Sequence, residues 1–387
     1  MTKIHFIGIG GIGVSGLASI FLSKGFEVSG SDLSQSAVTD DLEKKGAKVF
    51  IGHNEKNLGN PDKVVCSPAI PETNPELKKA RDLGIKCLSY PEALGELTKD
   101  YFTIAVAGTH GKSSTASMIA QILIKAGFDP TFVIGTKPGS RVGKSKYLVI
   151  EADEYKRSFL NYHPDLAVVT NIEADHLDYF KDLKEIESVF KEFKNQSKKV
   201  LDWKEEDIKL QIPGDHNRKN ASAALSVARE LGIDDKISLK ALFDYKGVWR
   251  RFEIKGELNG ALMIDDYAHH PTEVKATIEG AKEGYPDKEI VAVFQAHQYL
   301  RLAKLFDDFS SSFGSADRVV ITDVFSVAGR EEEIQKTGKD LAEAIVGSEF
   351  VSFGNLGKFV KKMAKPDQVI LMLGAGDIYK VTEELLK

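Results

Sequence analysis

The chain has 387 residues, which is enough for two or three domains, and its 42% hydrophobic and 28% charged residues are ordinary for a globular protein. A net charge of −5 without a block of Lys or Arg argues against nucleic acid or an acidic membrane as a partner. No apolar run reaches the roughly 18 residues that a membrane span needs, and the N-terminus lacks a signal-peptide pattern. We therefore expect a cytoplasmic protein. Cys66 and Cys87 have no metal-site spacing and lie in apolar segments, which predicts two unreactive core thiols.

Short apolar strands alternate with amphipathic helices along almost the whole sequence, which favours an α/β fold with parallel sheets. We divide the chain into three units, at residues 1–99, 100–248 and 249–387. In the first unit we expect strands at 4–9 and 27–30 and a helix at 11–24. In the second we expect strands at 101–107, 147–150 and 166–170 and helices at 114–127 and 221–231. In the third we expect strands at 262–265, 290–294, 318–322 and 369–373 and a helix from 271.

The first strand is followed by the glycine-rich segment 8–13, GIGGIG, in which a helix begins. Asp32 comes about twenty residues later, after a second strand. This spacing is the dinucleotide-binding fingerprint, and it suits NAD or any nucleotide diphosphate. The fingerprint is weak when it stands alone, because the glycines can also serve only the tight packing of helix on strand. A nucleotide site in the first unit is our expectation, with its ligand left open.

A second glycine-rich segment, residues 107–115 (AGTHGKSST), lies between an apolar strand and a helix. A turn at such a junction aims backbone N–H groups and the positive helix end at an anion. Lys112 adds a positive charge for phosphate, and Ser113 adds a hydroxyl for Mg²⁺. The usual phosphate loop has glycine where this chain has Val106, so this one is a shortened phosphate cradle. We expect it to bind ATP.

Acidic and polar side chains follow the next two strands of the same unit. Glu151 ends the strand at 147–150, where nucleotide-hydrolysing folds hold Mg²⁺. Asp153 and Glu154 come directly after it, and such a cluster is costly unless it meets cations. The following strand runs into VVTNIEADH, in which His176 is either a second metal ligand or a capping residue. Its place at a strand end favours the metal ligand.

Three later motifs carry side chains that suit a nucleotide. Residues 214–220, GDHNRKN, precede a helix, so His216 and Asn220 either face an adenine edge or cap the helix. Residues 250–253, RRFE, place a basic pair at the start of a strand. Residues 265–271, DDYAHHP, end a strand with two carboxylates and two histidines, which suit ribose hydroxyls and metal-bound phosphate.

Taken together, these segments resemble the Mur ligases, ATP-dependent enzymes that form amide bonds in peptidoglycan precursors. The resemblance rests on GIGGIG, GTHGK, EADE, VVTNIEADH, GDHNRKN, RRFE, DDYAHHP and GAGD, in this order over nearly the whole chain. Each motif is modest, but the set is very specific. His110, where Asn is commoner, points to the branch that joins L-alanine to UDP-N-acetylmuramate, and so does SPAIP at 67–71. A sister enzyme that attaches recycled peptide to the same nucleotide sugar shares the His110 signature.

The resemblance implies a three-domain α/β architecture. A Rossmann-like first domain would hold the UDP of the nucleotide sugar, a P-loop ATPase-like central domain would hold ATP, and a Rossmann-like C-terminal domain would present the amino acid. The UDP-sugar contacts implied are Gly8, Gly10, Gly11, Gly13, Ser15, Asp32, Ser67 and His110. The ATP contacts implied are Gly108, Thr109, His110, Gly111, Lys112, Ser113, Ser114, His216, Asn220, Arg251 and Asp266.

The resemblance also implies chemical roles. Lys112 would contact the β- and γ-phosphates, Arg251 the γ-phosphate and Asp266 the ribose. One Mg²⁺ would be held by Ser113 and Glu151, and a second by His176. Asn171 and His110 would border the muramoyl lactate. The catalytic set is then Lys112, His176, Arg251 and Asn171.

The sequence departs from the family at the amino-acid site. The family has a motif resembling QPHRYSRT, whereas residues 295–302 of this chain are QAHQYLRL. Arg301, with His297 and Tyr299, is expected to bind the amino acid, and its guanidinium suits a carboxylate. Gln298, however, replaces the first arginine of the motif. The loss of one of two charged contacts weakens the case for free L-alanine.

A second departure is length. Between about Lys198 and Gly214 the family usually carries a longer stretch of strands, and this chain has only residues 199–213 there. Because the core motifs survive, we interpret this as compaction rather than decay.

The sequence therefore predicts an ATP- and Mg²⁺-dependent ligase for UDP-N-acetylmuramate and L-alanine, with no nucleic-acid or membrane partner, as a monomer or weak homodimer. The nearest alternative is the peptide-recycling ligase, although Arg301 with Tyr299 favours a small amino acid. A nucleotide-sugar-binding relative without catalysis is disfavoured because Lys112, Glu151 and His176 all remain. An NAD-dependent oxidoreductase is disfavoured because no feature of the sequence supplies a hydride-transfer site.

Overall fold

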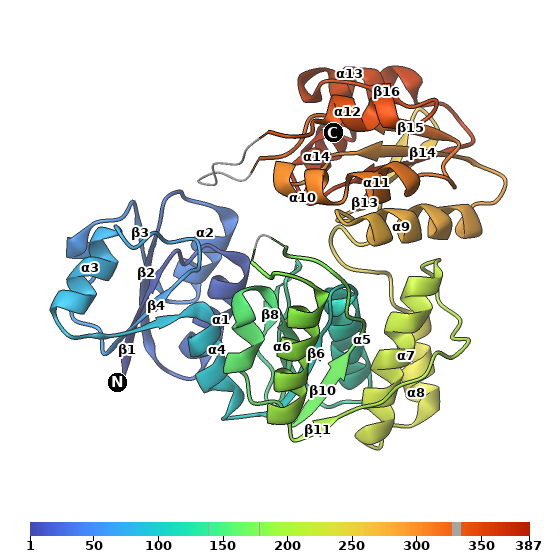
Figure 1. Ribbon diagram of the computed structural model, residues 1–387. Helices are drawn as coiled ribbons and strands as arrows, with labels where there is room; N and C mark the ends of the chain where they lie inside the picture. The colour runs from blue at the N-terminus through green and yellow to red at the C-terminus, as the bar shows by residue number, and fades with distance from the viewer. Residues whose placement is uncertain (138, 178, 327–333) are drawn as a thin grey trace. The chain divides into compact units, whose positions relative to one another are not determined.

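The computed structural model describes residues 1–137, 139–177, 179–326 and 334–387 (Figure 1). The chain forms two compact units. The first comprises Met1–Glu173, Lys184–Lys204 and Ala223–Ala241, and the second comprises Ala174–Leu183, Glu205–Ser222 and Leu242–Lys387. Two sheets lie in the first unit and a third sheet lies in the second, so the predicted α/β class is confirmed.

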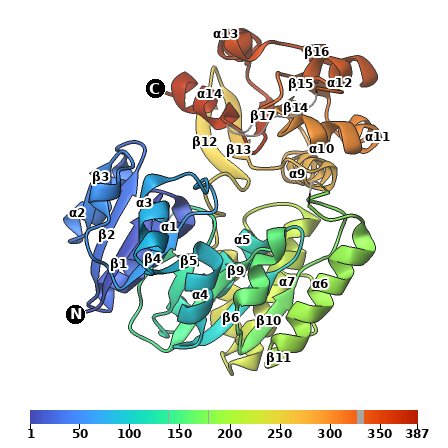
Figure 2. The same cartoon turned by 60° about the vertical axis from the view of Figure 1, so that its left-hand side comes forward.

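The first sheet is parallel throughout, with strand order β3-β2-β1-β4-β5. Its strands are β1 (Lys3–Ile7), β2 (Glu27–Asp32), β3 (Lys48–Ile51), β4 (Lys63–Cys66) and β5 (Lys86–Ser89). Its helices are α1 (Ile12–Ser23), α2 (Ala37–Lys44), the short η1 (Glu55–Asn57), α3 (Pro75–Asp82) and α4 (Tyr90–Thr98). Helix α1 packs on β2 and helix α3 packs on β4 and β5, as can be followed in Figure 2.

The second sheet has the order β11-β10-β6-β9-β7-β8, with β6 between β9 and β10. Its strands are β6 (Phe102–Ala107), β7 (Thr131–Val133), β8 (Ser140–Arg141), β9 (Tyr147–Ala152), β10 (Leu166–Val169) and β11 (Lys199–Val200). The helices of this part of the chain are α5 (Lys112–Lys125), η2 (Tyr155–Asn161), α6 (Leu183–Gln196), α7 (Asp215–Glu230) and α8 (Asp235–Phe243). Because β6 is central, the loop that follows it lies between the ends of β9 and β10.

The predicted start of one helix was wrong. We expected a helix from residue 221, whereas α7 begins at Asp215, so most of the GDHNRKN motif lies inside it. Gly214, with φ +103°, ends the preceding segment. Asn217 and Asn220 are buried at helical spacing, so two polar residues occupy the inner face where an apolar pattern would mark a helix.

The third sheet has the order β12-β13-β17-β14-β15-β16, and β12 is antiparallel to β13. Its strands are β12 (Glu253–Leu258), β13 (Ala261–Asp266), β14 (Glu289–Phe294), β15 (Arg318–Ile321), β16 (Glu349–Phe350) and β17 (Gln368–Leu373). Its helices are α9 (Pro271–Gly284), α10 (Tyr299–Lys304), α11 (Phe306–Ser311), α12 (Gly338–Ala344), α13 (Phe353–Met363) and α14 (Ile378–Leu385).

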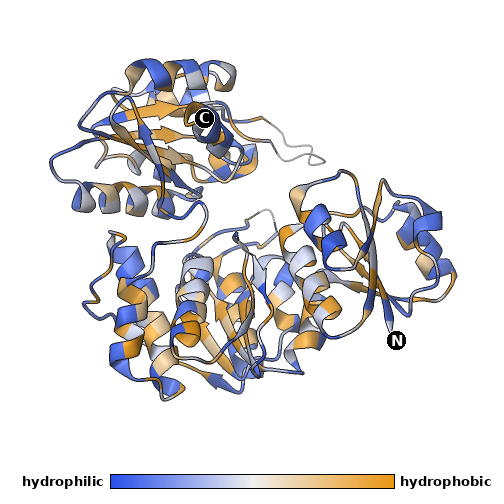
Figure 3. Cartoon of the chain, turned by 180° about the vertical axis from the view of Figure 1, so that it is seen from behind, coloured by the Kyte–Doolittle hydropathy of each residue, from blue (hydrophilic) through white to orange (hydrophobic). Residues whose placement is uncertain are grey.

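Strand β14 shows why the third sheet is apolar on both faces. Ile290, Ala292 and Phe294 join the core under α9, α11 and α12, whereas Val291 and Val293 join the core under α13 and α14. Successive side chains of a strand point to opposite faces, so a continuous apolar run predicts a strand covered on both sides. Figure 3 shows these hydrophobic strands between helices that carry hydrophilic residues.

No helix in the parts of the chain that the structure describes is long and apolar enough to cross a membrane. The two cysteines are free and half-buried. Burial, with the neighbouring Cys87, raises the pKa of Cys66 to about 12, and burial also raises the pKa of Cys87. Both therefore remain protonated thiols near neutral pH.

Candidate active site

The phosphate loop joins β6 to α5 through residues 108–111. Gly108 and Gly111 have φ values of +139° and +80°, a region that glycine adopts without a steric cost. A Cβ atom at Gly108 would lie 2.0 Å from the Oγ1 atom of Thr170, so the close approach also requires glycine. Helix α5 starts at Lys112 with Gly111 as its N-cap, and Ser113 and Ser114 are buried in its first turn. The unpaired N–H groups of this turn make the loop an anion site.

Lys112 is held in place by the loop itself. Its Nζ atom donates to the carbonyl oxygens of Gly108 at 2.7 Å and Thr109 at 3.2 Å, and it forms a 2.9 Å ion pair with Glu154. Burial lowers the pKa of Lys112, but the carboxylate of Glu154, with Asp153 and Glu151, raises it above its usual value. Burial raises the pKa of Glu154 to about 7 in spite of Lys112. Lys112 is therefore a fixed cation at the phosphate loop.

Ser113 and Glu151, which we predicted as ligands of one metal ion, are in direct contact. The Oγ atom of Ser113 donates to Oε2 of Glu151 at 2.9 Å, and the backbone N–H of Gly135 donates to the same oxygen at 2.8 Å. The parallel register of β6 and β9 pairs Val106 with Glu151, which places this carboxylate beside the loop. A hydroxyl and a carboxylate are hard oxygen donors of the kind that Mg²⁺ prefers, so these residues fit that ion.

Residues that follow β10 form hydrogen bonds with the other side of the phosphate loop. Oδ1 of Asn171 accepts the backbone N–H of His110 at 2.9 Å, and the backbone N–H of Thr109 donates to the Asn171 carbonyl at 3.1 Å. The Nε2 atom of His110 lies 3.7 Å from Oε2 of Glu173. Asn171 and His110, predicted to border the same substrate group, are thus joined by a hydrogen bond. Asn171 fixes the backbone of the loop.

The glycine-rich segment of the first sheet lies at the edge where the strand order reverses. The chain runs from β1 to β2 and β3 on one side and to β4 and β5 on the other, and ligands bind at such a switch point. Gly8 has φ +81°, and a Cβ atom there would lie 2.9 Å from Cβ of Ser67, which follows β4. The predicted residues Gly8 and Ser67 therefore face each other across the switch point.

Asp32 is turned onto the glycine segment. Its Oδ2 atom accepts the backbone N–H of Gly10 at 2.8 Å. Gly11 is the N-cap of α1, and a Cβ atom at Gly13 would lie 2.8 Å from the ring of Tyr90. Ser15 donates its hydroxyl proton to the carbonyl oxygen of Ile12, within α1. The predicted UDP-sugar residues of this segment thus form one local structure at the start of α1.

The remaining predicted ATP residues lie in the second compact unit. Both oxygens of Asp266 accept backbone N–H groups, from Phe252 and Ala268, each at 2.7 Å. Burial raises the pKa of Asp266, and Arg251 opposes this. The guanidinium of Arg251 lies 4.9 Å from the centre of the Tyr267 ring. Asp266 therefore also has a structural task, since it ties the start of β12 to the end of β13.

His216 and Asn220 occupy successive turns at the start of α7. Burial lowers the pKa of His216 to about 4, so its ring is neutral at physiological pH. Its Nδ1 atom is buried without a hydrogen-bond partner among the described residues, and Asn220 is 7% exposed. A neutral imidazole and an amide at this spacing suit the polar edge of a base.

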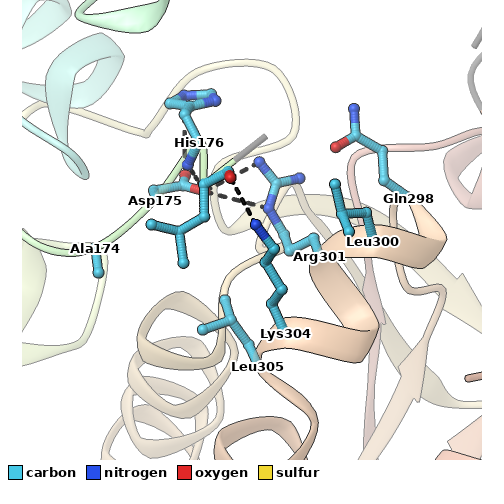
Figure 4. Close-up of a pocket in the computed structure, with 9 residues that line it drawn as sticks. Ala174, Asp175, His176, Gln298, Leu300, Arg301, Lys304 and Leu305 are labelled. Carbon is cyan, nitrogen blue, oxygen red and sulfur yellow. Dashed lines mark hydrogen bonds and ion pairs between the residues drawn. The ribbon is translucent and has the colours of Figure 1, made fainter. Parts of the chain in front are cut away.

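Of the three predicted amino-acid residues, only Arg301 borders a pocket in the second unit (Figure 4). Arg301 lines it and pairs with Asp175, whose Oδ1 accepts Nε at 3.3 Å and Nη2 at 3.2 Å. Despite burial, Arg301 holds the pKa of Asp175 well below its usual range.

His297 lies outside the lining of this pocket, with its Nδ1 3.4 Å from Nη1 of Arg301 and its ring stacked on another aromatic ring. Tyr299 packs against the core under α9. The nine lining residues are Ala174, Asp175, His176, Leu177, Gln298, Leu300, Arg301, Lys304 and Leu305.

His176, the predicted second metal ligand, belongs to this pocket lining. It has φ +52°, and its backbone N–H donates to Oδ1 of Asp175 at 2.7 Å. The sequence prediction missed Asp175 and Lys304 as site residues, and it noted Glu154 only as part of an acidic cluster. The acidic motif was a usable signal for Glu154, whereas nothing in the sequence links Asp175 with a residue 126 positions away.

Three family models match the chain in series. They are the Mur ligase family catalytic domain over residues 3–102, the Mur ligase middle domain over 106–201, and the Mur ligase glutamate ligase domain over 250–376. The chain is also 41% identical to a UDP-N-acetylmuramate–L-alanine ligase of Acetivibrio thermocellus, over 99% of this chain and 95% of that protein. The chain belongs to the Mur ligase family, and its predicted three-domain Mur ligase architecture is confirmed.

Within the family, a relative of the same name from Clostridium acetobutylicum is 39% identical over 99% of this chain and 97% of its own length. The crystal structure of the UDP-N-acetylmuramate-alanine ligase MurC of Thermotoga maritima matches with a TM-score of 0.84 at 27% identity, covering 100% of this chain and 98% of that one. The alignment with the Acetivibrio protein spans 456 residues against 387 here, so that relative contains segments that this chain lacks.

Proposed function

We propose that this chain joins L-alanine to the lactyl carboxylate of UDP-N-acetylmuramate at the expense of ATP, in peptidoglycan precursor synthesis. One observation carries the proposal. A chain 41% identical along nearly its full length to a ligase of this name also has Lys112 bound to the loop at a helix N-terminus, where Ser113 contacts Glu151. These are the groups that an ATP-dependent ligase needs at the transferred phosphate.

The chemistry follows from charge. A carboxylate oxygen of the sugar attacks the γ-phosphorus of ATP, the bond to the β-phosphate oxygen breaks, and ADP leaves with that electron pair. Lys112 lowers the cost of bringing these anions together, and we assign the same task to Arg251. The resulting acyl phosphate is attacked at its carbonyl carbon by the neutral amine of L-alanine. Phosphate then leaves, and the amine gives up one proton.

Ser113 and Glu151 would hold a Mg²⁺ ion, and we assign His176 to a second. Bound there, the ions supply positive charge to the phosphate oxygens. The structure gives the first assignment its support, because Ser113 and Glu151 already meet through their oxygen atoms at 2.9 Å.

We assign the nucleotide sugar to residues 1–99, ATP to residues 100–248 and the amino acid to residues 249–387. In the first of these, Gly8 and Ser67 at the switch point support a nucleotide diphosphate. We further propose that the protein works in the cytoplasm as a monomer or weak homodimer, without nucleic acid or membrane.

The test is phosphate release by the purified protein with Mg²⁺–ATP and UDP-N-acetylmuramate. L-alanine, L-serine, glycine and the free tripeptide are added in turn, and products are identified by mass. Release stimulated by L-alanine, with a product of matching mass, supports the proposal. Stimulation by the tripeptide alone assigns the chain to peptide recycling instead. If none of these amines stimulates phosphate release, although ATP and UDP-sugar both bind, a ligase for these substrates is refuted.

A further inference from the structure

The charge of Arg301 is already neutralised in the pocket of Figure 4. One oxygen of Asp175 accepts the N–H groups of both Nε and Nη2, and the two side chains are only 9% and 8% exposed. The Nε–Nη2 edge is one that can bind a carboxylate through two parallel hydrogen bonds. In this structure Asp175 occupies it, so Arg301 by itself presents no net positive charge to a substrate anion.

Gln298 does not restore that charge. It lines the pocket at the position where the family motif has its first arginine, but its amide is neutral. Its backbone has φ +71°, and its N–H donates to the carbonyl oxygen of Phe325 at 3.0 Å. The backbone at this position is therefore fixed, and its side chain can offer a substrate carboxylate only uncharged donors.

Lys304 supplies a positive charge in the same pocket. It follows Arg301 by three residues in α10, so both side chains project from one side of the helix, toward the segment Asp175–Leu177 (Figure 4). Its Nζ atom donates to the carbonyl oxygen of Leu177 at 2.6 Å. No carboxylate of the described residues lies within ion-pair distance of it. An ammonium group has three N–H donors, so one such bond leaves two for a ligand.

We propose that Lys304 binds the carboxylate of the amino-acid substrate and replaces the arginine that is lost at Gln298. The inference rests on the proposed function and names a residue of its amine site. A substrate carboxylate is attracted by Lys304 and kept off Asp175 by like charge, which orients the amino acid. Ala174, Leu300 and Leu305 line the same pocket and offer an apolar surface to a small side chain such as a methyl group.

The experiment removes the charge of Lys304 and the carboxylate of the substrate, each alone and both together. Lys304→Met keeps the aliphatic stem and removes the charge, and L-alaninamide keeps the amine and removes the carboxylate. KM for each amine is measured by phosphate release at saturating ATP and UDP-N-acetylmuramate. Direct binding of L-alanine is also measured by calorimetry, in the presence of the nucleotide sugar and a non-hydrolysable ATP analogue.

We expect Lys304→Met to raise KM and the dissociation constant for L-alanine by about tenfold or more, the loss of one charge-assisted hydrogen bond, with kcat within about twofold. The constants for L-alaninamide should stay unchanged, and Lys304→Arg should recover much of the lost affinity. Lys362→Met removes another exposed lysine of the same domain and serves as the control. Thermal unfolding of each variant verifies that the fold is intact.

An unchanged KM and dissociation constant for L-alanine in Lys304→Met would overturn the inference. Equal losses for L-alanine and L-alaninamide would also overturn it, because the lysine would then act without the carboxylate. A loss for the free tripeptide alone would reassign Lys304 to a different carboxylate and reject the alanine site. If the wild-type protein releases no phosphate with any amine, the proposed function fails, and the binding constants still decide the role of Lys304.

Discussion

Asp265 is a buried acid whose ionisation the fold opposes. It lies at the end of β13, is 1% exposed, and accepts a hydrogen bond from Thr382 at Oδ1. Its Oδ2 atom is buried without a hydrogen-bond partner among the described residues. Burial raises the pKa of Asp265 to about 7, and the bond from Thr382 opposes this only in part. The folded protein therefore holds a proton on Asp265 over a pH range where the unfolded chain does not.

This difference makes folding stability depend on pH. Between the unfolded pKa of 3.8 and the folded value of about 7, the folded state binds more protons, so stability falls as pH rises. Each pH unit in this window costs about 1.4 kcal/mol. From pH 5 to pH 8 the wild-type protein should thus lose about 3 kcal/mol through Asp265. Asp265→Asn cannot ionise and should lack this contribution.

The assay is equilibrium unfolding in urea at pH 5, 6, 7 and 8. Trp203 is replaced by Phe so that Trp249, which contacts Tyr379 next to the third sheet, reports on this domain. The difference in free energy of unfolding between wild type and Asp265→Asn should grow by about 3 kcal/mol over this range in favour of the variant. The exposed Asp367→Asn is the control and should run parallel to wild type. Parallel curves for Asp265→Asn would show that Asp265 titrates normally, and the reasoning would be wrong.

Three further predictions concern the first unit. Lys112→Ala should lower kcat for ligation by at least about 100-fold, through loss of charge at the transferred phosphate, with circular dichroism unchanged; retained turnover would reject the role of Lys112. Glu76 is fully buried, which raises its pKa, but the four hydrogen bonds that it accepts lower the pKa to about 2. Ionised Glu76 therefore contributes about 3 kcal/mol to the free energy of unfolding above pH 4.5, and this contribution is lost as pH falls toward 2. Glu76→Gln should show a flatter dependence of stability on pH in this acid range, and an equally steep dependence would contradict the prediction. Gly8→Ala should destabilise the protein by about 1–2 kcal/mol, because Gly8 has a positive φ and a Cβ atom there would crowd Ser67. The same variant should raise KM for UDP-N-acetylmuramate, and an unchanged KM would place the nucleotide elsewhere.

The sequence by itself determined the elements that are encoded locally. A strand, a glycine turn and a helix start form one continuous pattern, so the sequence predicted the strand, turn and helix around Lys112 and Ser113. The apolar runs of β6, β9 and β14 likewise predicted strands. The start of α7 was missed because Asn217 and Asn220 are buried on its inner face, where a pattern of apolar residues gives no sign of them.

The tertiary structure alone decided which distant side chains meet. Glu151 reaches Ser113 because β9 pairs with β6 in a register that no local pattern specifies. Asp175 neutralises Arg301 across 126 residues of sequence, and this contact changes a presumed carboxylate-binding arginine into one half of an ion pair. The burial of Asp265 and of Glu154 depends in the same way on the packed core. Strand register, burial and ion pairing all arise between segments far apart in the chain, whereas propensity and motif spacing describe only neighbours.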